Sequence, residues 1–361
     1  MTKAAELAKM GEVLTNSQIG GRRNIIINGG MICSQRATSA TGVGSGFAYP
    51  TLDRYKIVPS TSGRATMSQS TDAPDGFANS LKLECTTADT SIAAGEYFNI
   101  RQSLEGQDVQ QLKKGTSSAE KITVSFYVKG NASATYLLEL SDQDNTRYNG
   151  QTFAVTTSWN RIVLTYNGDT SGVLDNDNAR SLDLNFWLHG GSTYTGGTFT
   201  SNTWHGTDNQ RLASITSFFD STDREFFITG LQMEVGSQAT PFEHRSFGEE
   251  LALCQRYFYK TQSDSTYDFF SNGVAVSSTL AYNGIALPCK MRSAPTLTTS
   301  GNLRNYRNGG SAITTIAINH TSAYFCVLEC TSSGGGLTAG DGNLFGANND
   351  ADAAVMLSAE L

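Results

Sequence analysis

The chain has 361 residues, of which 39% are hydrophobic and 16% are charged, and its formal net charge is −7. That length accommodates two compact domains, and 36 glycines are typical of many short strands and tight turns. The longest basic cluster is Arg22-Arg23, so the basic stripe of a nucleic-acid surface is absent. The sequence also lacks the ~20-residue apolar run of a membrane span and the apolar core of a signal peptide. We therefore expect synthesis in the cytosol, no nucleic-acid partner and no membrane span.

Residues 1–23 are predicted to form an arm that contains one short helix. Leu7, Met10 and Leu14 repeat at helical spacing, and Thr2 can cap the helix. An isolated helix of roughly thirteen residues is marginal in water, so we expect order only against a partner. The arm is interpreted as an anchor, and a frayed terminus is the alternative.

Residues 24–245 contain about nine segments whose apolar residues predict β-strands. The clearest is 122–130, in which Ile122, Val124, Phe126 and Val128 face inward because side chains alternate along a strand. The other strands are expected at 25–27, 52–58, 81–85, 97–102, 136–140, 159–166, 182–188 and 226–235. With no central helix, these strands predict a two-sheet jelly-roll β-sandwich.

The stretch 226–260 joins this domain to the next one. Ser246 followed three residues later by Glu249 predicts an N-terminally capped helix. We expect a linker helix over 246–260, preceded by a strand that Gly236 and Pro241 end. One face of that strand is predicted to carry Phe227, Thr229, Leu231, Met233 and Val235.

Residues 261–361 are predicted to form a smaller C-terminal β-sandwich, which makes the whole chain all-β. Its strands are expected at 267–270, 274–280, 284–287, 296–299, 313–318, 324–328 and 355–361.

Catalytic and metal-binding motifs are absent from the sequence. There is no GxSxG, HExxH or phosphate-binding glycine loop, and six scattered cysteines and four scattered histidines form no zinc spacing. Asp220 and Asp223 could supply the paired carboxylates of a glycan-cleaving enzyme, but solvated turn residues are the favoured interpretation. We expect no enzyme activity, no cofactor and no metal.

Two segments have the aromatic and polar side chains that sugar recognition requires. The long loop from His189 to Asn209 supplies one group, and the segment 304–308 supplies the other, with Asn305 and Asn308 at its sides. In the alternative interpretation of the loop, its large rings form a minor core. The candidate glycan-binding residues are Tyr194, Phe199, Asn202, Trp204, His205, Arg304, Tyr306 and Arg307.

The segment GLQMEVGSQATPFEHRSFGEELALCQRYFYK, at 230–260, resembles one found in fibre and appendage proteins of tailed bacteriophages. NIIINGGM at 24–31 and SAEL at 358–361 agree with it, and the resemblance covers most of residues 24–260. In that family the segment closes a jelly-roll similar to carbohydrate-binding modules. Such modules often hold calcium near their first and last strands, but Met31 and Ile32 stand where its acidic ligand is expected.

The resemblance implies a non-enzymatic virion structural protein, namely a tail fibre. Its N-terminal arm would attach it to other virion proteins of the tail or capsid, and its β domains would bind a host-surface glycan. Homotrimers are the usual symmetry of such fibres, and the location would be the virion after synthesis in the host cytoplasm. A head decoration or capsid fibre protein is the first alternative, and a glycan depolymerase is the alternative from another class.

Overall fold

The computed structural model describes residues 3–4, 23–307 and 310–361, so Leu7, Met10 and Leu14 of the predicted anchor lie outside the described residues. The chain divides into an N-terminal unit that ends at Glu250 and a C-terminal unit, Leu251–Leu361. Strands dominate both units, which confirms the all-β fold class. None of the described helices is long and apolar enough to cross a membrane.

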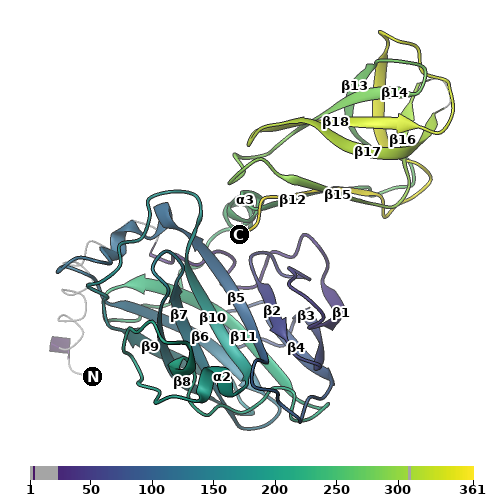
Figure 1. The fold of residues 1–361 in the computed structure, drawn as a ribbon. Helices are drawn as coiled ribbons and strands as arrows, with labels where there is room; N and C mark the ends of the chain where they lie inside the picture. Colours follow the sequence, from purple (N-terminus) through teal and green to yellow (C-terminus); the bar gives the residue numbers. More distant parts are fainter. Residues whose placement is uncertain (1–2, 5–22, 308–309) are drawn as a thin grey trace. The chain divides into compact units, whose positions relative to one another are not determined.

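The N-terminal unit is a β-sandwich of two antiparallel sheets (Figure 1). The six-stranded sheet has the order β1-β3-β4-β11-β6-β9 and the five-stranded sheet the order β2-β5-β10-β7-β8. Their bounds are β1 Ser39–Val43, β2 Lys56–Ser60, β3 Arg64–Ser70, β4 Ser80–Thr87, β5 Tyr97–Glu105, β6 Ile122–Gly130, β7 Ala134–Asp142, β8 Arg147–Val155, β9 Asn160–Tyr166, β10 Arg180–Gly190 and β11 Glu225–Val235. Short helical turns lie at η1 Gly106–Asp108, η2 Gln110–Leu112, α2 Ser192–Thr195 and η3 Asp208–Gln210.

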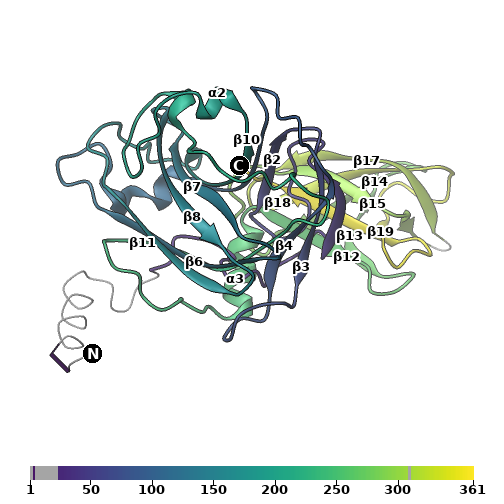
Figure 2. The same cartoon turned by 90° about the horizontal axis from the view of Figure 1, so that it is seen from below.

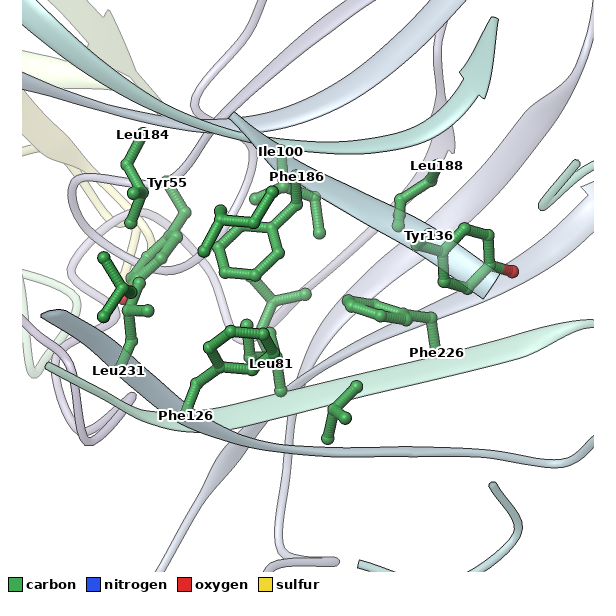
Figure 3. Packing of buried hydrophobic residues seen from close by; sticks show 14 of the residues in the cluster. Tyr55, Leu81, Ile100, Phe126, Tyr136, Leu184, Phe186, Leu188, Phe226 and Leu231 are labelled. Atoms are coloured by element: carbon green, nitrogen blue, oxygen red, sulfur yellow. The ribbon is translucent and has the colours of Figure 1, made fainter. Parts of the chain in front are cut away.

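Side chains from the inner faces of the two sheets form one core (Figure 3). Phe126 of β6 meets Phe186 of β10 edge to face, with ring centroids 5.2 Å apart. Burying each such side chain contributes about 1.5–3 kcal/mol, so the alternation that identified β6 in the sequence also fixes which face of it is buried. Figure 3 also shows Leu81, Phe226 and Leu231 of one sheet pointing toward Ile100, Leu184 and Leu188 of the other.

Strand β11 changes face at Gly230, which corrects the prediction of one continuous alternation. Gly230 has φ +63°, and the pairing with β6 shifts register between Thr229 and Gln232. Such a bulge inserts one residue and reverses which positions face the core. Phe227 and Thr229 therefore lie on the other face, where Phe227 contacts Trp159. The core receives Phe226, Ile228, Leu231 and Met233.

The predicted first strand at 25–27 is not a strand, although Ile26 and Ile27 are buried. The reason is the side chain of Asn24, which makes the hydrogen bonds to the backbone of β11 that a neighbouring strand would otherwise make. Its Nδ2 donates to the Leu231 carbonyl at 3.1 Å, and its Oδ1 accepts from the Met233 N–H at 3.0 Å.

Helix α3 (Phe247–Gln255) has the predicted capping box: Ser246 N–H and Oγ both donate to Glu249, at 3.0 and 2.9 Å. The helix ends before the predicted linker does, since residues 258–260 already belong to strand β12 (Phe258–Gln262).

The C-terminal unit combines a six-stranded closed barrel, β13-β14-β18-β17-β16-β19, with a three-stranded sheet, β12-β20-β15. The predicted strand 274–280 in fact covers the end of one strand and the start of the next. A turn separates them, in which the N–H groups of Val276 and Ser277 both donate to the Leu280 carbonyl. Figure 2 shows the barrel strands from below. The bounds are β13 Phe269–Ala275, β14 Leu280–Ala286, β15 Thr296–Ser300, β16 Leu303–Tyr306, β17 Ser311–Thr321, β18 Phe325–Ser332, β19 Gly342–Ala347 and β20 Ala354–Ser358.

Candidate functional site

The outer face of the five-stranded sheet carries a row of polar side chains across four strands. The pairing register places Lys56 of β2 opposite Arg101 of β5, Arg101 opposite Asn185 of β10, and Asn185 opposite Glu139 of β7. Residues paired in this way point to the same face. Arg101 Nε donates to Asn185 Oδ1 at 2.6 Å, and Asn185 Nδ2 donates to Glu139 Oε1 at 3.1 Å. Arg101, Asn185 and Glu139 therefore form a hydrogen-bonded network across β5, β10 and β7.

The next row is more apolar and includes Val58, Asn99, Trp187 and Leu137 in the same strand order. Both rows contribute to the floor of an open groove with a cavity volume of about 300 Å³. The sandwich thus places a recess on the face of β2, β5 and β10 that is turned away from the core.

Aromatic rings form one part of this groove. Tyr194 lies 5.1 Å from Trp187 and 5.7 Å from Tyr97, measured between ring centroids. Tyr194 belongs to the short helix α2, which lies beside β10 (Figure 2). Burial raises the pKa of the Tyr194 hydroxyl, so this hydroxyl stays protonated and can donate a hydrogen bond at neutral pH.

A close backbone approach fixes the position of α2. Thr193 N–H donates to the Ala94 carbonyl at 2.9 Å, and Leu212 N–H donates to the Tyr194 carbonyl at 3.0 Å. At Gly191, directly before the helix, a Cβ would lie 2.1 Å from the Ala93 carbonyl oxygen. Only glycine fits there, so this residue allows the loop to hold Tyr194 over the sheet.

Arg211 joins the aromatic part of the groove to the polar row. Its guanidinium lies 3.9 Å from the ring centroid of Tyr148 and 5.0 Å from that of Trp187. It forms two parallel hydrogen bonds to Glu139, with Nε–Oε2 2.9 Å and Nη2–Oε1 2.7 Å. Burial alone would lower the pKa of Arg211, but the Glu139 carboxylate outweighs burial and raises it.

Positive charge predominates along the groove. Four of the lining residues are basic: Lys56, Arg101, Arg180 and Arg211. Two fully buried carboxylates are paired with them, since Asp183 contacts both Arg101 and Arg180, and Glu139 contacts Arg211. The excess is two positive charges in a chain whose net charge is −7, so an anionic ligand is favoured here.

Two lining residues carry buried polar atoms without a partner among the described residues: Asn99 Oδ1 and Trp187 Nε1. Buried polar side-chain atoms are usually hydrogen-bonded. In a recess, the missing partner is commonly a water or a ligand hydroxyl.

The structure divides the predicted loop residues into two groups. Tyr194 lines the groove, and Phe199 packs against Leu137 and Trp187 next to it. Asn202 and Trp204 instead tie the loop to Asn167: Asn202 Oδ1 accepts from the Asn167 N–H at 2.8 Å, and Trp204 Nε1 donates to the Asn167 carbonyl at 2.7 Å.

His205 has a similar anchoring contact, because it pairs with Tyr148 through two backbone hydrogen bonds of 2.7 and 3.0 Å. Its pKa is lowered by burial. In the described structure, Asn202, Trp204 and His205 thus hold the loop in place. The alternative interpretation of the sequence had given this role to Trp204 and Phe199.

Of the predicted C-terminal residues, Tyr306 is exposed, Arg304 and Arg307 are half-buried, and the neighbouring Asn305 is buried. The Arg304 guanidinium lies 4.6 Å from the ring centroids of both Tyr267 and Tyr306. Arg307 forms an ion pair with Asp341, and Asn308 lies outside the described residues.

The acidic residues considered for catalysis do not form a facing pair. Asp220 forms two hydrogen bonds with Arg224, one of them Nε–Oδ1 at 2.9 Å, and Asp223 is an exposed residue of the adjacent turn. Asp220 therefore serves the local turn.

Sequence reasoning missed most of the groove. Tyr97, Arg101, Trp187 and Arg211 were not among the candidates, because three of them lie within strands and were assigned only to strand structure. A signal was present: in YFNIRQ, the residues that alternate with the core residues Phe98 and Ile100 carry an aromatic, an amide and a guanidinium group.

The fold and the groove define a β-sandwich with an open recess on one sheet. The sequence matches no protein-family model, and no curated protein matches it. Among solved structures, CBM4 is similar over 58% of this chain and 97% of its own length, at 10% identity and a TM-score of 0.30. TmCBM61 in complex with β-1,4-galactotriose is similar over 59% of this chain and 99% of its own, at 9% identity and a TM-score of 0.29.

A third similar structure is the family 11 carbohydrate-binding module of a Clostridium thermocellum cellulosomal cellulase. It covers 54% of this chain and 97% of its own length, at 12% identity and a TM-score of 0.29. Similarity at these TM-scores does not indicate a function. The function proposed below is therefore based on the groove itself.

Proposed function

We propose that this protein is a non-enzymatic glycan-binding component of a bacteriophage virion, and that the groove on β2, β5 and β10 binds an acidic glycan. One observation carries the glycan part. Three aromatic rings, Tyr97, Trp187 and Tyr194, lie in the same open recess as four basic side chains with an excess of positive charge.

The chemistry of the groove fits a sugar that carries a carboxylate. Aromatic faces suit the apolar C–H side of a pyranose ring, and the Tyr194 ring is held in place by Tyr97 and Trp187. Guanidinium groups bind carboxylates in a planar, bidentate way. Arg180 is the most accessible arginine of the groove, with 32% of its side chain exposed. We therefore expect Arg180 to pair with the carboxylate of the ligand.

The carboxylates of the groove favour binding over cleavage. A glycosidase needs one protonated and one ionised carboxyl group on either side of the scissile bond. Asp183 and Glu139 are both fully buried and paired with arginines. Neither carboxylate is placed to donate a proton to a leaving group.

Calorimetric titration of the purified protein with uronate-containing and neutral oligosaccharides of equal length tests this proposal. We expect binding of the uronate series, about tenfold weakening by Arg180→Gln, and a similar loss by Tyr194→Ala, the size of one good contact. Tyr324→Ala, which removes a 60% exposed tyrosine from the other unit, is the control and should bind normally. Equal binding by all three variants would show that the groove is not the glycan-binding site. Release of oligosaccharides would favour the depolymerase alternative.

The virion part of the proposal is supported by the resemblance of residues 230–260 to phage fibre and appendage proteins. Individual glycan contacts are weak, and several copies, as in a homotrimer, would raise the overall affinity. The test is a chain without residues 1–20 supplied during phage assembly. We expect it to fold and bind glycan but to be missing from particles, whereas normal incorporation would contradict the anchor. Labelling intact particles distinguishes a tail fibre from a head decoration protein.

A further inference from the structure

Three potential metal ligands meet at one end of the five-stranded sheet. Asp89 and Glu96 lie in the segment between β4 and β5, and His189 lies near the end of β10. Their ligand atoms, one carboxylate oxygen from each acid and one imidazole nitrogen, are all within 4.8 Å of one another. Because β5 and β10 are adjacent strands, the fold brings together residues about a hundred positions apart in the sequence.

The His189 ring has one nitrogen bound and one nitrogen without a partner. Its side chain is fully buried, and Nδ1 lies 2.8 Å from Ser217 Oγ. Nε2 has no hydrogen-bond partner among the described residues and lies 3.9 Å from Glu96 Oε2, too far for a hydrogen bond. A buried nitrogen in this position requires a partner, and it faces two carboxylates.

The two carboxylates also lack a cation. Three other buried acids of the sandwich have one: Asp142 contacts Lys114, Asp169 contacts Arg147, and Glu139 contacts Arg211. A fourth, Glu234, is held by hydrogen bonds from Thr240 instead. No lysine or arginine of the described chain forms an ion pair with Asp89 or Glu96. Asp89 is nonetheless buried, with only 4% of the residue exposed.

Two hydrogen bonds hold the Asp89 carboxylate in place, one from Thr61 Oγ1 at 2.6 Å and one from the Ser62 N–H at 3.1 Å. Both of these bonds go to Asp89 Oδ2, which leaves Oδ1 for an ion.

We propose that Asp89, Glu96 and His189 form a binding site for one divalent cation of the zinc type. An imidazole nitrogen with two carboxylate oxygens suits such an ion, whereas calcium prefers six to eight oxygen ligands. Ser217 Oγ accepts from Nδ1–H in this arrangement and orients the ring, so that Nε2 presents its lone pair to the metal.

Binding requires a modest closure of the site. Ligand atoms of a tetrahedral zinc ion with bonds of about 2.0–2.1 Å lie roughly 3.3 Å apart, against the 4.8 Å limit for this cluster. Glu96 has the more exposed side chain, at 19%, while His189 is enclosed. The closure is therefore assigned to Glu96, and it weakens the 2.7 Å hydrogen bond that the Ala93 N–H donates to Glu96 Oε2. The exposed side of Glu96 also gives an ion access from solvent, and water would complete the coordination.

Equilibrium dialysis of the tag-free, chelator-treated protein against Zn²⁺ tests the site, with Co²⁺ as a spectroscopic probe of nitrogen and oxygen ligation. We expect one ion per chain and loss of at least about tenfold in affinity in Glu96→Gln and in His189→Gln. His320→Gln removes an exposed imidazole and Asp75→Asn an exposed carboxylate, and both should bind like the unchanged protein.

Glu96→Gln keeps the proposal testable if the buried His189→Gln variant fails to fold. Unchanged zinc affinity in a folded Glu96→Gln protein, or no bound zinc in the unchanged protein, would overturn the site. Preferential binding of Ca²⁺ over Zn²⁺ would overturn the assignment of the cation. The measurement uses metal binding alone, so its result is independent of whether the groove binds a glycan.

Discussion

Lys114 is a single buried cation that two acids share. Its Nζ contacts Asp142 and lies 3.1 Å from Asp169, and its side chain is only 3% exposed. Removing one partner of a buried ion pair leaves uncompensated charge, which typically costs 3–5 kcal/mol. We expect Lys114→Met to lower the free energy of unfolding by about 3–5 kcal/mol in a urea titration.

The neighbouring lysine provides the matched control for this prediction. Lys113 forms an ion pair with Glu120 that is largely exposed to solvent, with 54% of the Lys113 side chain accessible. Lys113→Met should change stability by less than about 1 kcal/mol, as surface pairs do. Equal effects of the two substitutions would show that burial of Lys114 is not what makes it important.

Asp169 predicts how stability depends on acid. Burial would raise its pKa, but hydrogen bonds from Arg147, Ser171 and Lys114 outweigh burial and lower the pKa below the ordinary value. A carboxyl whose pKa is lowered by folding stabilises the protein above its unfolded pKa, near 3.9, and loses that contribution as pH falls through the folded pKa. Melting temperature should therefore fall below about pH 4, and less steeply in Asp169→Asn; an equally steep fall would contradict this role.

At the scale of single elements, the bulge in β11 depends on Gly230. A Cβ there would lie 2.7 Å from the Phe77 ring, and its φ is +63°. We expect Gly230→Ala to destabilise the N-terminal unit by about 1–3 kcal/mol, the usual cost of a strained backbone. Gly248→Ala is the control, because a Cβ meets nothing within 4 Å there and alanine is a better helix former; it should be neutral or stabilising in the same thermal melt.

Helix α3 is tied to the first turn of the sandwich by Glu250. Its Oε1 accepts from the Asn28 N–H at 2.5 Å and from Arg245 Nη1 at 3.3 Å, and the Arg245 side chain is only 6% exposed. Glu250→Ala should cost about 3–5 kcal/mol, because a buried guanidinium loses the nearer of its two carboxylate partners. Glu249→Ala removes the hydrogen bonds of the helix cap and should cost about 1 kcal/mol. Denaturant titration of both variants measures the two losses of stability. A smaller loss in Glu250→Ala than in Glu249→Ala would contradict the role of Glu250 as a partner of Arg245.

Strands were predictable where one face is apolar and the other is not. Ile122–Gly130 has that alternation, and its predicted bounds match β6. The strands β1, β3 and β8, with sequences SATGV, RATMSQS and RYNGQTFAV, were missed because polar and small residues dominate them. Neighbouring strands, rather than local preference, determine their conformation.

At the scale of the whole molecule, two separate cores predict two unfolding events. The N-terminal unit is built on one large cluster and the C-terminal unit on another, which includes Met291, Leu328 and Phe345. Calorimetry should resolve two transitions. Lys114→Met should shift only the transition of the N-terminal unit; a shift of both together would show that the units unfold as one.

The groove was less predictable than the fold because it depends on strand order. Arg101 and Asn185 contact each other although they are 84 residues apart, and only the adjacency of β5 and β10 brings them together. Tyr194 was predicted because it lies in a glycine-rich loop, where an aromatic residue is not accounted for by the apolar face of a strand. The long-range contacts that complete the site have no local pattern in the sequence.

The pairing of β12 with β20 has a mechanical consequence. Phe258, the first residue of β12, pairs with Ser358 at the end of β20, and Gln262 pairs with Ala354. A tensile load applied between residues 257 and 359 would thus act on one end of this ladder and open its rungs one after another. Peeling of this kind needs less force than sliding two strands past each other, because only one rung bears the load at a time. Under such a load the pairs from Phe258–Ser358 to Gln262–Ala354 would separate in that order.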